Sequence, residues 1–384
     1  MASVFLFTRC FRAQVLPDPR GDAYAGSETC IRCHASISKS YAHTAHFFST
    51  RIADSVGIAG NFSPGFNTFR INQTTEIRME KRDSGYYQVL YEGNQETEAH
   101  RFDLVMGAVK GQTYLYWKGN QFFQLPVSYL APLHQWTASP GYSISGLNFS
   151  RPVLKECFGC HSSFASGDPH GWSGDGIQKN SWVFNIDCER CHGPSEAHVR
   201  FHEEHPEEKK AKFITSFQSL GQQQKIDLCA VCHSGTKHIL LKSTFAFQVG
   251  DSLSSFMIPL QTGDQLDVHG NQTQLLAQSK CFRMSSIDCT TCHNAHEDQR
   301  GMIKTFNERC QGCHPTVRHE TKMISVANRN FLQDNCTTCH MPAQASRTIE
   351  LITEKNTTAI PAMVINHRIA IYPEESAKTM GAGK

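Results

Sequence analysis

The sequence predicts a mainly α-helical and irregular fold of short helices and loops, with a small antiparallel β insert. Three observations lead to this expectation. A five-residue pattern, Cys-x-x-Cys-His, occurs seven times, and six of its copies fall within residues 157–340. The long stretch 35–156 between the first two copies has a different composition, rich in aromatic and β-branched residues.

The repeated pattern has a defined chemical use. Two thiols at this spacing can add to the two vinyl groups of one haem, and the adjacent imidazole can then ligate the iron. An isolated C-x-x-C would also suit a redox dithiol or half of a zinc site. Zinc ribbons have no reason to place histidine after every copy, and a disulfide framework would not impose a constant spacing. The copies use fourteen of the sixteen cysteines, so the sequence predicts seven covalently attached c-type haems.

We number the motifs 1 to 7 in chain order. The predicted attachment sites are Cys30 and Cys33, Cys157 and Cys160, Cys188 and Cys191, Cys229 and Cys232, Cys289 and Cys292, Cys310 and Cys313, and Cys336 and Cys339. The predicted proximal iron ligands are His34, His161, His192, His233, His293, His314 and His340. Because each porphyrin supplies a large apolar surface, short helices and loops can wrap a close-packed haem array without an aliphatic core.

The β insert is expected within residues 61–135. The runs "YYQVLYEG", "HRFDLVMG" and "QTYLYWKGNQFFQLPVSYL" alternate partly between apolar and polar residues and are broken by glycines and by a Lys-Gly-Asn turn at 118–120. We expect their aromatic side chains to form the sheet core rather than to surround a cofactor. They include Tyr114, Tyr116, Trp117, Phe122 and Phe123.

The motifs divide the rest of the chain. Residues 23–60 form a first haem segment, 136–345 a six-haem domain, and 346–384 a C-terminal segment that packs back on the haem domain. Residues 1–22 contain one short apolar run, 4–7, which Arg9 interrupts, and we interpret this segment as the remnant of an export signal. Haem is attached to such motifs outside the bacterial cytoplasm, so we expect a periplasmic or cell-surface protein.

Composition excludes other classes of partner. The formal net charge is +2, with 37 basic and 35 acidic residues. The chain therefore has no large excess of positive charge that would attract nucleic acid. No apolar run is long enough to be a transmembrane segment.

A second imidazole on the other face of a haem iron gives a low-spin, electron-transferring centre. Thirteen histidines lie outside the motifs and can supply such distal ligands. The segments "YAGSETCIRCHASISKSYAHTAHF", "DCERCHGPSEAHVRFH", "SKCFRMSSIDCTTCHNAH" and "CTTCHMP" followed by "NHRIAIYP" resemble the multihaem cytochromes of the cytochrome c554-related family.

This resemblance implies a set of distal ligands. They are His198 and His296, then His46, His319 and His367, and finally His170 and His269, either of which His134 or His100 could replace. Because His296 is only three residues from His293, the two cannot easily reach opposite faces of one porphyrin, so His296 is expected to bind a neighbouring haem. The remaining histidines, His43, His202, His205 and His238, are expected at the surface.

The favoured function is electron transfer between a donor and an acceptor redox protein through mostly bis-histidine haems. All seven motifs end in histidine, whereas an iron that is open to substrate is often marked by a variant such as C-x-x-C-K. Two alternatives stay open. One is a multihaem oxidoreductase that acts on a small nitrogen or sulfur compound at a five-coordinate haem. The other is a filament-forming extracellular cytochrome that self-associates into a haem-continuous assembly. The sequence identifies no catalytic residue and leaves open whether the protein is an enzyme.

Overall fold

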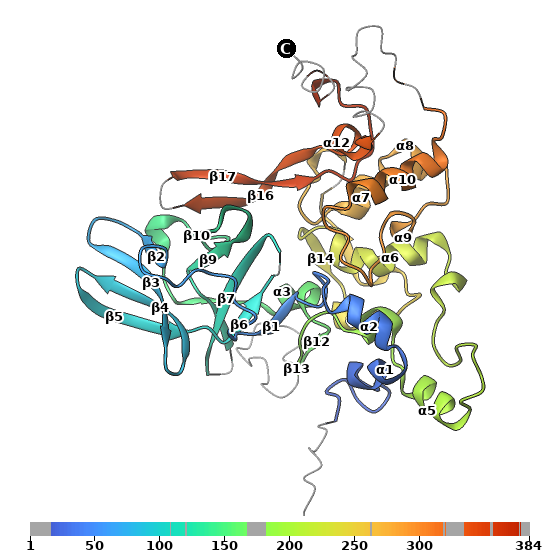
Figure 1. Ribbon diagram of the computed structural model, residues 1–384, viewed down its shortest axis with the longest axis horizontal. Helices are drawn as coiled ribbons and strands as arrows, with labels where there is room; N and C mark the ends of the chain where they lie inside the picture. The colour runs from blue at the N-terminus through green and yellow to red at the C-terminus, as the bar shows by residue number, and fades with distance from the viewer. Residues whose placement is uncertain are drawn as a thin grey trace, which may run out of the picture.

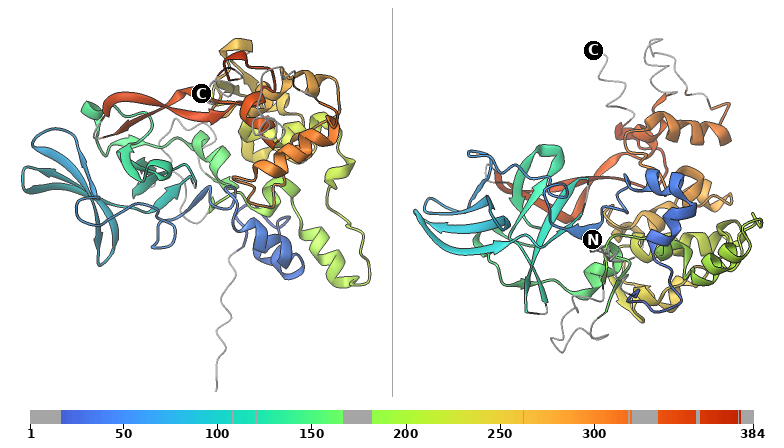
Figure 2. Two further views of the ribbon diagram at one scale, coloured as in Figure 1. Left: turned by 45° about the horizontal axis from the view of Figure 1, so that its top comes forward. Right: turned by 60° about the horizontal axis from the view of Figure 1, so that its bottom comes forward.

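The computed structural model describes residues 17–375 and 377, apart from 108, 120, 167–181, 262, 318, 320–333, 354 and 355. The molecule is elongated, with a β-rich part at one end and a helical part at the other (Figure 1). The chain begins in the helical part, crosses to the β-rich part and returns. A long two-stranded ribbon near the C-terminus extends from the helical part along the β-rich part in all three views (Figures 1 and 2).

Two antiparallel sheets form the β-rich part. The nine-stranded sheet has the order β1 (Thr50–Ile52), β6 (Leu104–Met106), β7 (Gly111–Lys118), β9 (Val127–Leu130), β10 (Gln135–Ala138), β16 (Ala343–Thr353) and β17 (Asn356–Ile365), with β8 (Gln121–Gln124) paired to β7 and β11 (Arg151–Pro152) paired to β8. The second sheet has the order β2 (Thr68–Arg70), β3 (Thr75–Arg82), β4 (Gly85–Glu92) and β5 (Gln95–Arg101). Two short pairs, β12 (Phe164–Ala165) with β13 (Trp182–Val183) and β14 (His238–Leu240) with β15 (Met257–Pro259), lie outside them.

The main core lies between these sheets. Successive side chains of a strand point to opposite faces, and in β3 the buried Ile77 and Met79 alternate with partly exposed polar residues. They pack in one cluster with Phe69, Tyr114 and Trp136. The structure confirms that the aromatic residues of 114–123 belong to sheet cores, since Tyr114, Tyr116 and Phe122 are buried and Trp117 and Phe123 pack against the same clusters.

The expectation of a mainly α-helical fold is wrong. The described part of the chain contains 17 strands, and the largest sheet joins strands of the predicted insert to β16 and β17, far outside it. The run 343–365 is rich in Ile and Thr, residues that are enriched in strands, and this composition fits a hairpin. Pro361 argues against a central strand, but β17 is an edge strand, where proline is tolerated.

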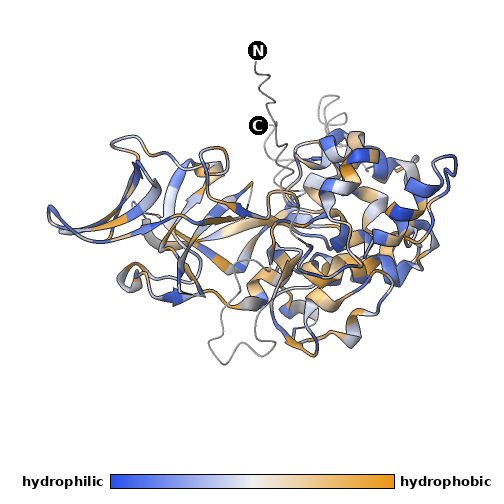
Figure 3. Cartoon of the chain, turned by 90° about the horizontal axis from the view of Figure 1, so that it is seen from below, coloured by the Kyte–Doolittle hydropathy of each residue, from blue (hydrophilic) through white to orange (hydrophobic). Residues whose placement is uncertain are grey.

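The helices are short. They are α1 (Ser27–Cys33), α2 (Ala35–Tyr41), α3 (Lys155–His161), α4 (Cys188–His192), α5 (Glu196–Glu204), α6 (Gln222–His233), α7 (Gln272–Ala277), α8 (Lys280–Arg283), α9 (Cys289–Cys292), α10 (Ile303–Cys313) and α12 (Cys336–His340). Single 3₁₀ turns are η1 (Ala131–Leu133), η2 (Ile144–Gly146), η3 (Phe217–Ser219), η4 (Thr244–Ala246), η5 (Leu253–Ser255) and η6 (Gly263–Gln265). Hydrophobic and hydrophilic residues are mixed along the helices (Figure 3), and none in the described residues has the length and apolar character needed to cross a membrane.

The C-terminal ribbon contacts both parts of the molecule. In β16, Thr353 pairs with Thr137 of β10, and Ile352 packs against the main core. Nearer the helical part, the Ser346 hydroxyl donates a 2.9 Å hydrogen bond to Asp267, and Val364 of β17 packs against Leu266, Val268 and Leu275. The domain boundaries expected from the sequence stay a prediction.

Candidate haem sites

Every Cys-x-x-Cys-His motif lies at the C-terminal end of a short helix or forms the whole of one. Residues three apart share one face of a helix, so both thiols of a motif face the same side and the histidine follows at the helix end. Two of these helices are capped by the preceding aspartate. The carboxylate of Asp187 accepts from the Arg190 amide in motif 3, and that of Asp288 accepts from the Thr290 and Thr291 amides in motif 5.

Four motif histidines face a second histidine from a distant part of the chain. The ring centres are separated by 6.2 Å for His233 and His46, 5.9 Å for His192 and His296, 6.3 Å for His293 and His367, and 6.3 Å for His340 and His319. Two metal–nitrogen bonds of about 2 Å, plus the two ring radii, place the centres of imidazoles that ligate one metal from opposite sides about 6 Å apart. The four pairs therefore have the spacing of axial ligands on a shared iron.

Hydrogen bonds orient several of these rings. The Nδ1 atoms of His340, His198 and His367 lie 2.8 Å, 2.8 Å and 3.2 Å from the backbone carbonyl oxygens of Ala370, Lys212 and Ile365. A ring that donates from Nδ1 to a carbonyl presents its bare Nε2 on the other side, the arrangement that metal-ligating histidines commonly have. In each of these histidines the atom left for iron is Nε2.

Burial keeps four of the paired imidazoles neutral. Desolvation, and then the nearby His233, lowers the pKa of His46 to about 4. Desolvation also lowers the pKa of His367 to about 4, and lowers those of His192 and His293. At neutral pH these rings carry no charge, which is the form that binds a metal.

Six of the short helices lack the buried side chains that they would need to be stable by themselves. Helices α1, α2, α5, α8, α9 and α12 contain no buried residue. Apolar side chains such as Ile31, Ile37 and Ile303 are 37%, 45% and 46% exposed. Isolated helices of four to nine residues are unstable in water. A large apolar group fixed at each motif would supply the missing packing surface, so these residues fit haem.

Two family models match the chain. "Cytochrome c554 and c-prime" matches residues 142–193, which include motifs 2 and 3, and "Doubled CXXCH motif" matches 284–319, which include motifs 5 and 6. This chain is a multihaem c-type cytochrome. The matches confirm the resemblance to the cytochrome c554-related family, and they identify haem c as the cofactor and electron transfer as the general role.

One solved structure shares the fold of this cytochrome, and a second is less similar. The outer cell wall cytochrome OcwA is 16% identical, with 94% of this chain and 82% of that chain covered and a TM-score of 0.59. The undecahaem cytochrome from the S-layer of Carboxydothermus ferrireducens is 18% identical, with 86% and 52% covered and a TM-score of 0.41. A search of curated proteins finds no match.

The other predicted ligands of the cytochrome are less closely paired. His269 is near enough to His161 of motif 2 to lower its pKa, after burial, which is the larger cause. His34 and His198 both lie near His192, and α1 and α5 are joined by an ion pair between Arg32 and Glu203 at 3.3 Å. The role of His198 as a distal ligand stays a prediction.

Several histidines are placed away from the motifs or outside the described residues. His170 lies in 167–181, which the structure does not describe. His100 stacks on Tyr116 within the β-rich part, with ring centres 4.0 Å apart, and His134 is exposed at the end of η1. His43 and His205 are exposed as predicted, whereas His202 and His238 each have a buried ring nitrogen without a described hydrogen-bond partner.

Sequence reasoning missed a buried ion cluster beside motif 3. Arg20 forms ion pairs of 2.9, 2.8 and 3.0 Å with Asp18, Asp187 and Glu189. Glu189 also accepts hydrogen bonds from the Ala25 and Gly26 amides, so the cluster ties the segment before motif 1 to motif 3. Burial by itself would lower the pKa of Arg20, but Asp18 and Asp187 outweigh it and raise that pKa. No local pattern marks Arg20, which the sequence places in the N-terminal segment.

Proposed function

We propose that this cytochrome is a heptahaem protein that passes electrons between redox partners through a continuous array of mostly bis-histidine haems. The observation that carries the proposal is that cysteines of different motifs meet in pairs. The thiols of Cys30 and Cys188 lie close enough for Cys188 to raise the pKa of Cys30, which brings motif 1 next to motif 3. The same kind of contact joins Cys160 to Cys232 and Cys229 to Cys289.

These contacts, together with weaker electrostatic ones, define the proposed path of electrons from motif to motif. Cys191 of motif 3 is electrostatically coupled to Cys232 and Cys229 of motif 4. At the other end, burial raises the pKa of Cys310 in motif 6 to about 11, and neighbouring Cys336 of motif 7 and Cys292 of motif 5 add to the shift. In the haem-loaded chain these sulfurs are thioethers at porphyrin edges. The proposed order is therefore motif 1, 3, 4, 5, 6 and 7, with motif 2 branching from motif 4.

The structural neighbour OcwA is by name an outer cell wall protein. We propose a cell-surface location for this cytochrome on that similarity of fold, and a donor and an acceptor redox protein as its partners. Self-association into a haem-continuous assembly stays a prediction.

Intact mass spectrometry tests the haem count. We expect seven covalently added haems, because each motif provides two thiols on one helix face and an imidazole directly after them. The oxidised protein should give a paramagnetic resonance spectrum dominated by low-spin iron. Six or fewer haems in fully matured protein would remove at least one motif from the array.

One observation favours a second candidate function, an oxidoreductase with a five-coordinate haem at motif 6. His314 is exposed, and within the described residues no second histidine ring is in contact with it. Carbon monoxide added to the reduced protein distinguishes the two functions. Binding of one equivalent supports an iron at motif 6 that is open to substrate, as the oxidoreductase needs, whereas absence of binding removes this second function.

A further inference from the structure

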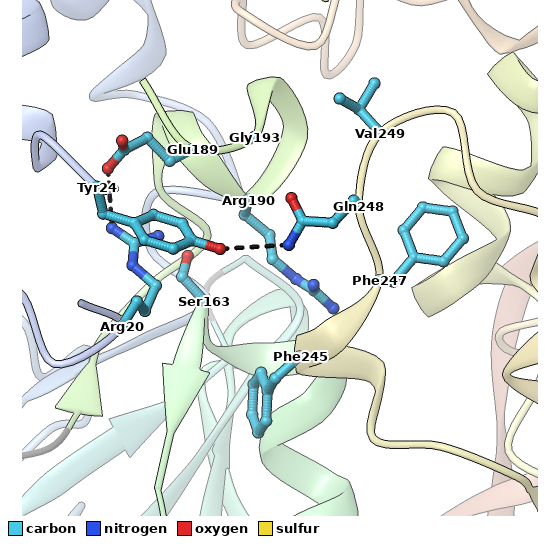
Figure 4. Close-up of a pocket in the computed structure, with 10 residues that line it drawn as sticks. All are labelled: Arg20, Tyr24, Ser163, Glu189, Arg190, Gly193, Phe245, Phe247, Gln248 and Val249. Atoms are coloured by element: carbon cyan, nitrogen blue, oxygen red, sulfur yellow. Dashed lines mark hydrogen bonds and ion pairs between the residues drawn. The ribbon is translucent and has the colours of Figure 1, made fainter. Parts of the chain in front are cut away.

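Arg190 lies where three motifs meet. It belongs to motif 3, and its guanidinium donates from Nη1 to the Thr244 carbonyl at 2.9 Å and from Nη2 to the Gly159 carbonyl of motif 2 at 3.3 Å. Figure 4 shows its side chain pointing away from Arg20 and Glu189, toward the segment that carries Phe245. A cation in the middle of motif 3 is thus directed at motif 2.

The charge of Arg190 has no acidic partner in the described part of the chain. The two neighbouring carboxylates, Asp187 and Glu189, are bound by Arg20 on the other side of α4. Arg190 bonds instead to carbonyl oxygens and lies over the Phe245 ring, 5.8 Å from its centre. Carbonyl groups orient the guanidinium without neutralising it, and an arginine is always charged.

Motifs 2 and 4 approach each other closely beside this cation. The Cys160 sulfur lies 3.9 Å from the Val231 carbonyl oxygen, and the Cys232 sulfur lies 3.8 Å from that of Gly159. A Cβ at position 159 would stand 2.4 Å from the Thr244 hydroxyl, so glycine allows the close approach of η4 to motif 2.

The electrostatic environment differs on the two sides of motif 3. At Cys160, Cys191 and Cys232, one from each of motifs 2, 3 and 4, the nearby positive charge is Arg190. At Cys30 of motif 1 the nearby charged groups are the carboxylates of Glu189 and Asp187. Two adjacent residues of motif 3 thus carry opposite charges in different directions. Glu189 lies near motif 1, whereas Arg190 lies near motifs 2 and 4.

We propose that Arg190 raises the reduction potentials of the haems on motifs 2 and 4 above that of the haem on motif 1. The proposal rests on the proposed electron-transfer function. A fixed positive charge favours the reduced iron, which carries one positive charge fewer, and the effect is strong where the effective dielectric constant is low. Electrons move toward higher potential, so the array has a direction, from motif 1 toward the junction of motifs 2, 3 and 4.

Potentiometric titration of the haem-loaded protein, followed by visible absorbance, tests this inference. In Arg190→Gln the highest-potential haems should shift so that their oxidised-to-reduced ratio at a fixed ambient potential rises about tenfold, which is 59 mV for a one-electron couple. Arg190→Lys keeps the positive charge, so its haem reduction potentials should stay close to those of the wild type. Arg32→Gln is the matched control because Arg32 occupies the same position in motif 1 but is 62% exposed and paired with Glu203, and its titration curve should match the wild type.

Three results would overturn the role of Arg190. The first is a potentiometric titration curve of Arg190→Gln that matches the wild type. The second is a shift in Arg190→Lys as large as that in Arg190→Gln. The third is loss of haem in both Arg190→Gln and a second neutral variant, Arg190→Met, while Arg190→Lys keeps its haems, because this would show a purely structural role. A wild-type protein without redox-active haem would refute the electron-transfer function itself, which is a different outcome.

Discussion

In the His296→Ala protein, one haem iron is expected to change from low to high spin while the number of attached haems stays the same. The ring of His296 lies 5.9 Å from that of His192, and the two planes are inclined by only 9°. Both rings thus have the geometry of ligands to one iron, that of motif 3. Removing the distal imidazole leaves the thioether bonds and His192 intact but opens one axial position. Low-temperature paramagnetic resonance and cyanide binding would measure the change.

A control and a double variant make this prediction specific. His43→Ala should leave the spectrum unchanged, because His43 is exposed. In His192→Ala/His296→Ala, a single iron should be affected, because the spacing of the two rings fits ligands of one iron. Damage to two irons in the double variant would assign His296 to another haem. An unchanged spectrum in His296→Ala would remove it from the ligand set.

Replacing Arg20 by methionine should cause the largest loss of stability. The side chains of Arg20, Asp187 and Glu189 are only 5%, 4% and 1% exposed. Methionine fills similar space but leaves two buried carboxylates without their cation. Breaking a buried ion pair in this way costs about 3–5 kcal/mol. Guanidinium unfolding followed by far-ultraviolet circular dichroism would measure the free energy.

The exposed pair of Arg32 and Glu203 is the control for that experiment. Its side chains are 62% and 59% exposed, and such surface pairs contribute about 0–1 kcal/mol. Arg32→Gln should therefore unfold close to the wild-type denaturant concentration. Equal effects of Arg20→Met and Arg32→Gln would show that the buried cluster does not hold the N-terminal segment to motif 3.

Local patterns predicted the local features of this cytochrome. The spacing of each motif placed two thiols on one helix face, and the aromatic alternation around Tyr114 predicted buried strands, because both depend on a few neighbouring residues. The sequence also favoured His296 as a ligand to a haem other than that of motif 5, and the structure brings its ring to His192 of motif 3.

Features that depend on distant contacts were harder to predict. His46 and His233 are paired across about half of the chain, and nothing near either residue specifies the other. Arg20 shows the same limit, since its partners Asp187 and Glu189 lie far along the sequence. The β16–β17 hairpin was missed for another reason. Its β-branched residues were present, but the segment was interpreted only as one that packs back on the haem domain.

The pairing of β10 with β16 sets an order of events in folding. Thr137 and Thr353 are more than two hundred residues apart, with motifs 2 to 7 between them. Closing a loop of that length costs conformational entropy, which is offset only when the contacts between the strands have formed. The last strands of the large sheet therefore join late. Until they do, β10 presents an unpaired edge, the kind of surface on which chains aggregate. A chain that ends after motif 7 would keep every haem-attachment site but would lose the strand that covers this edge, together with His367, the ring that faces His293. Solubility during biogenesis therefore depends on a segment that carries no haem-attachment motif.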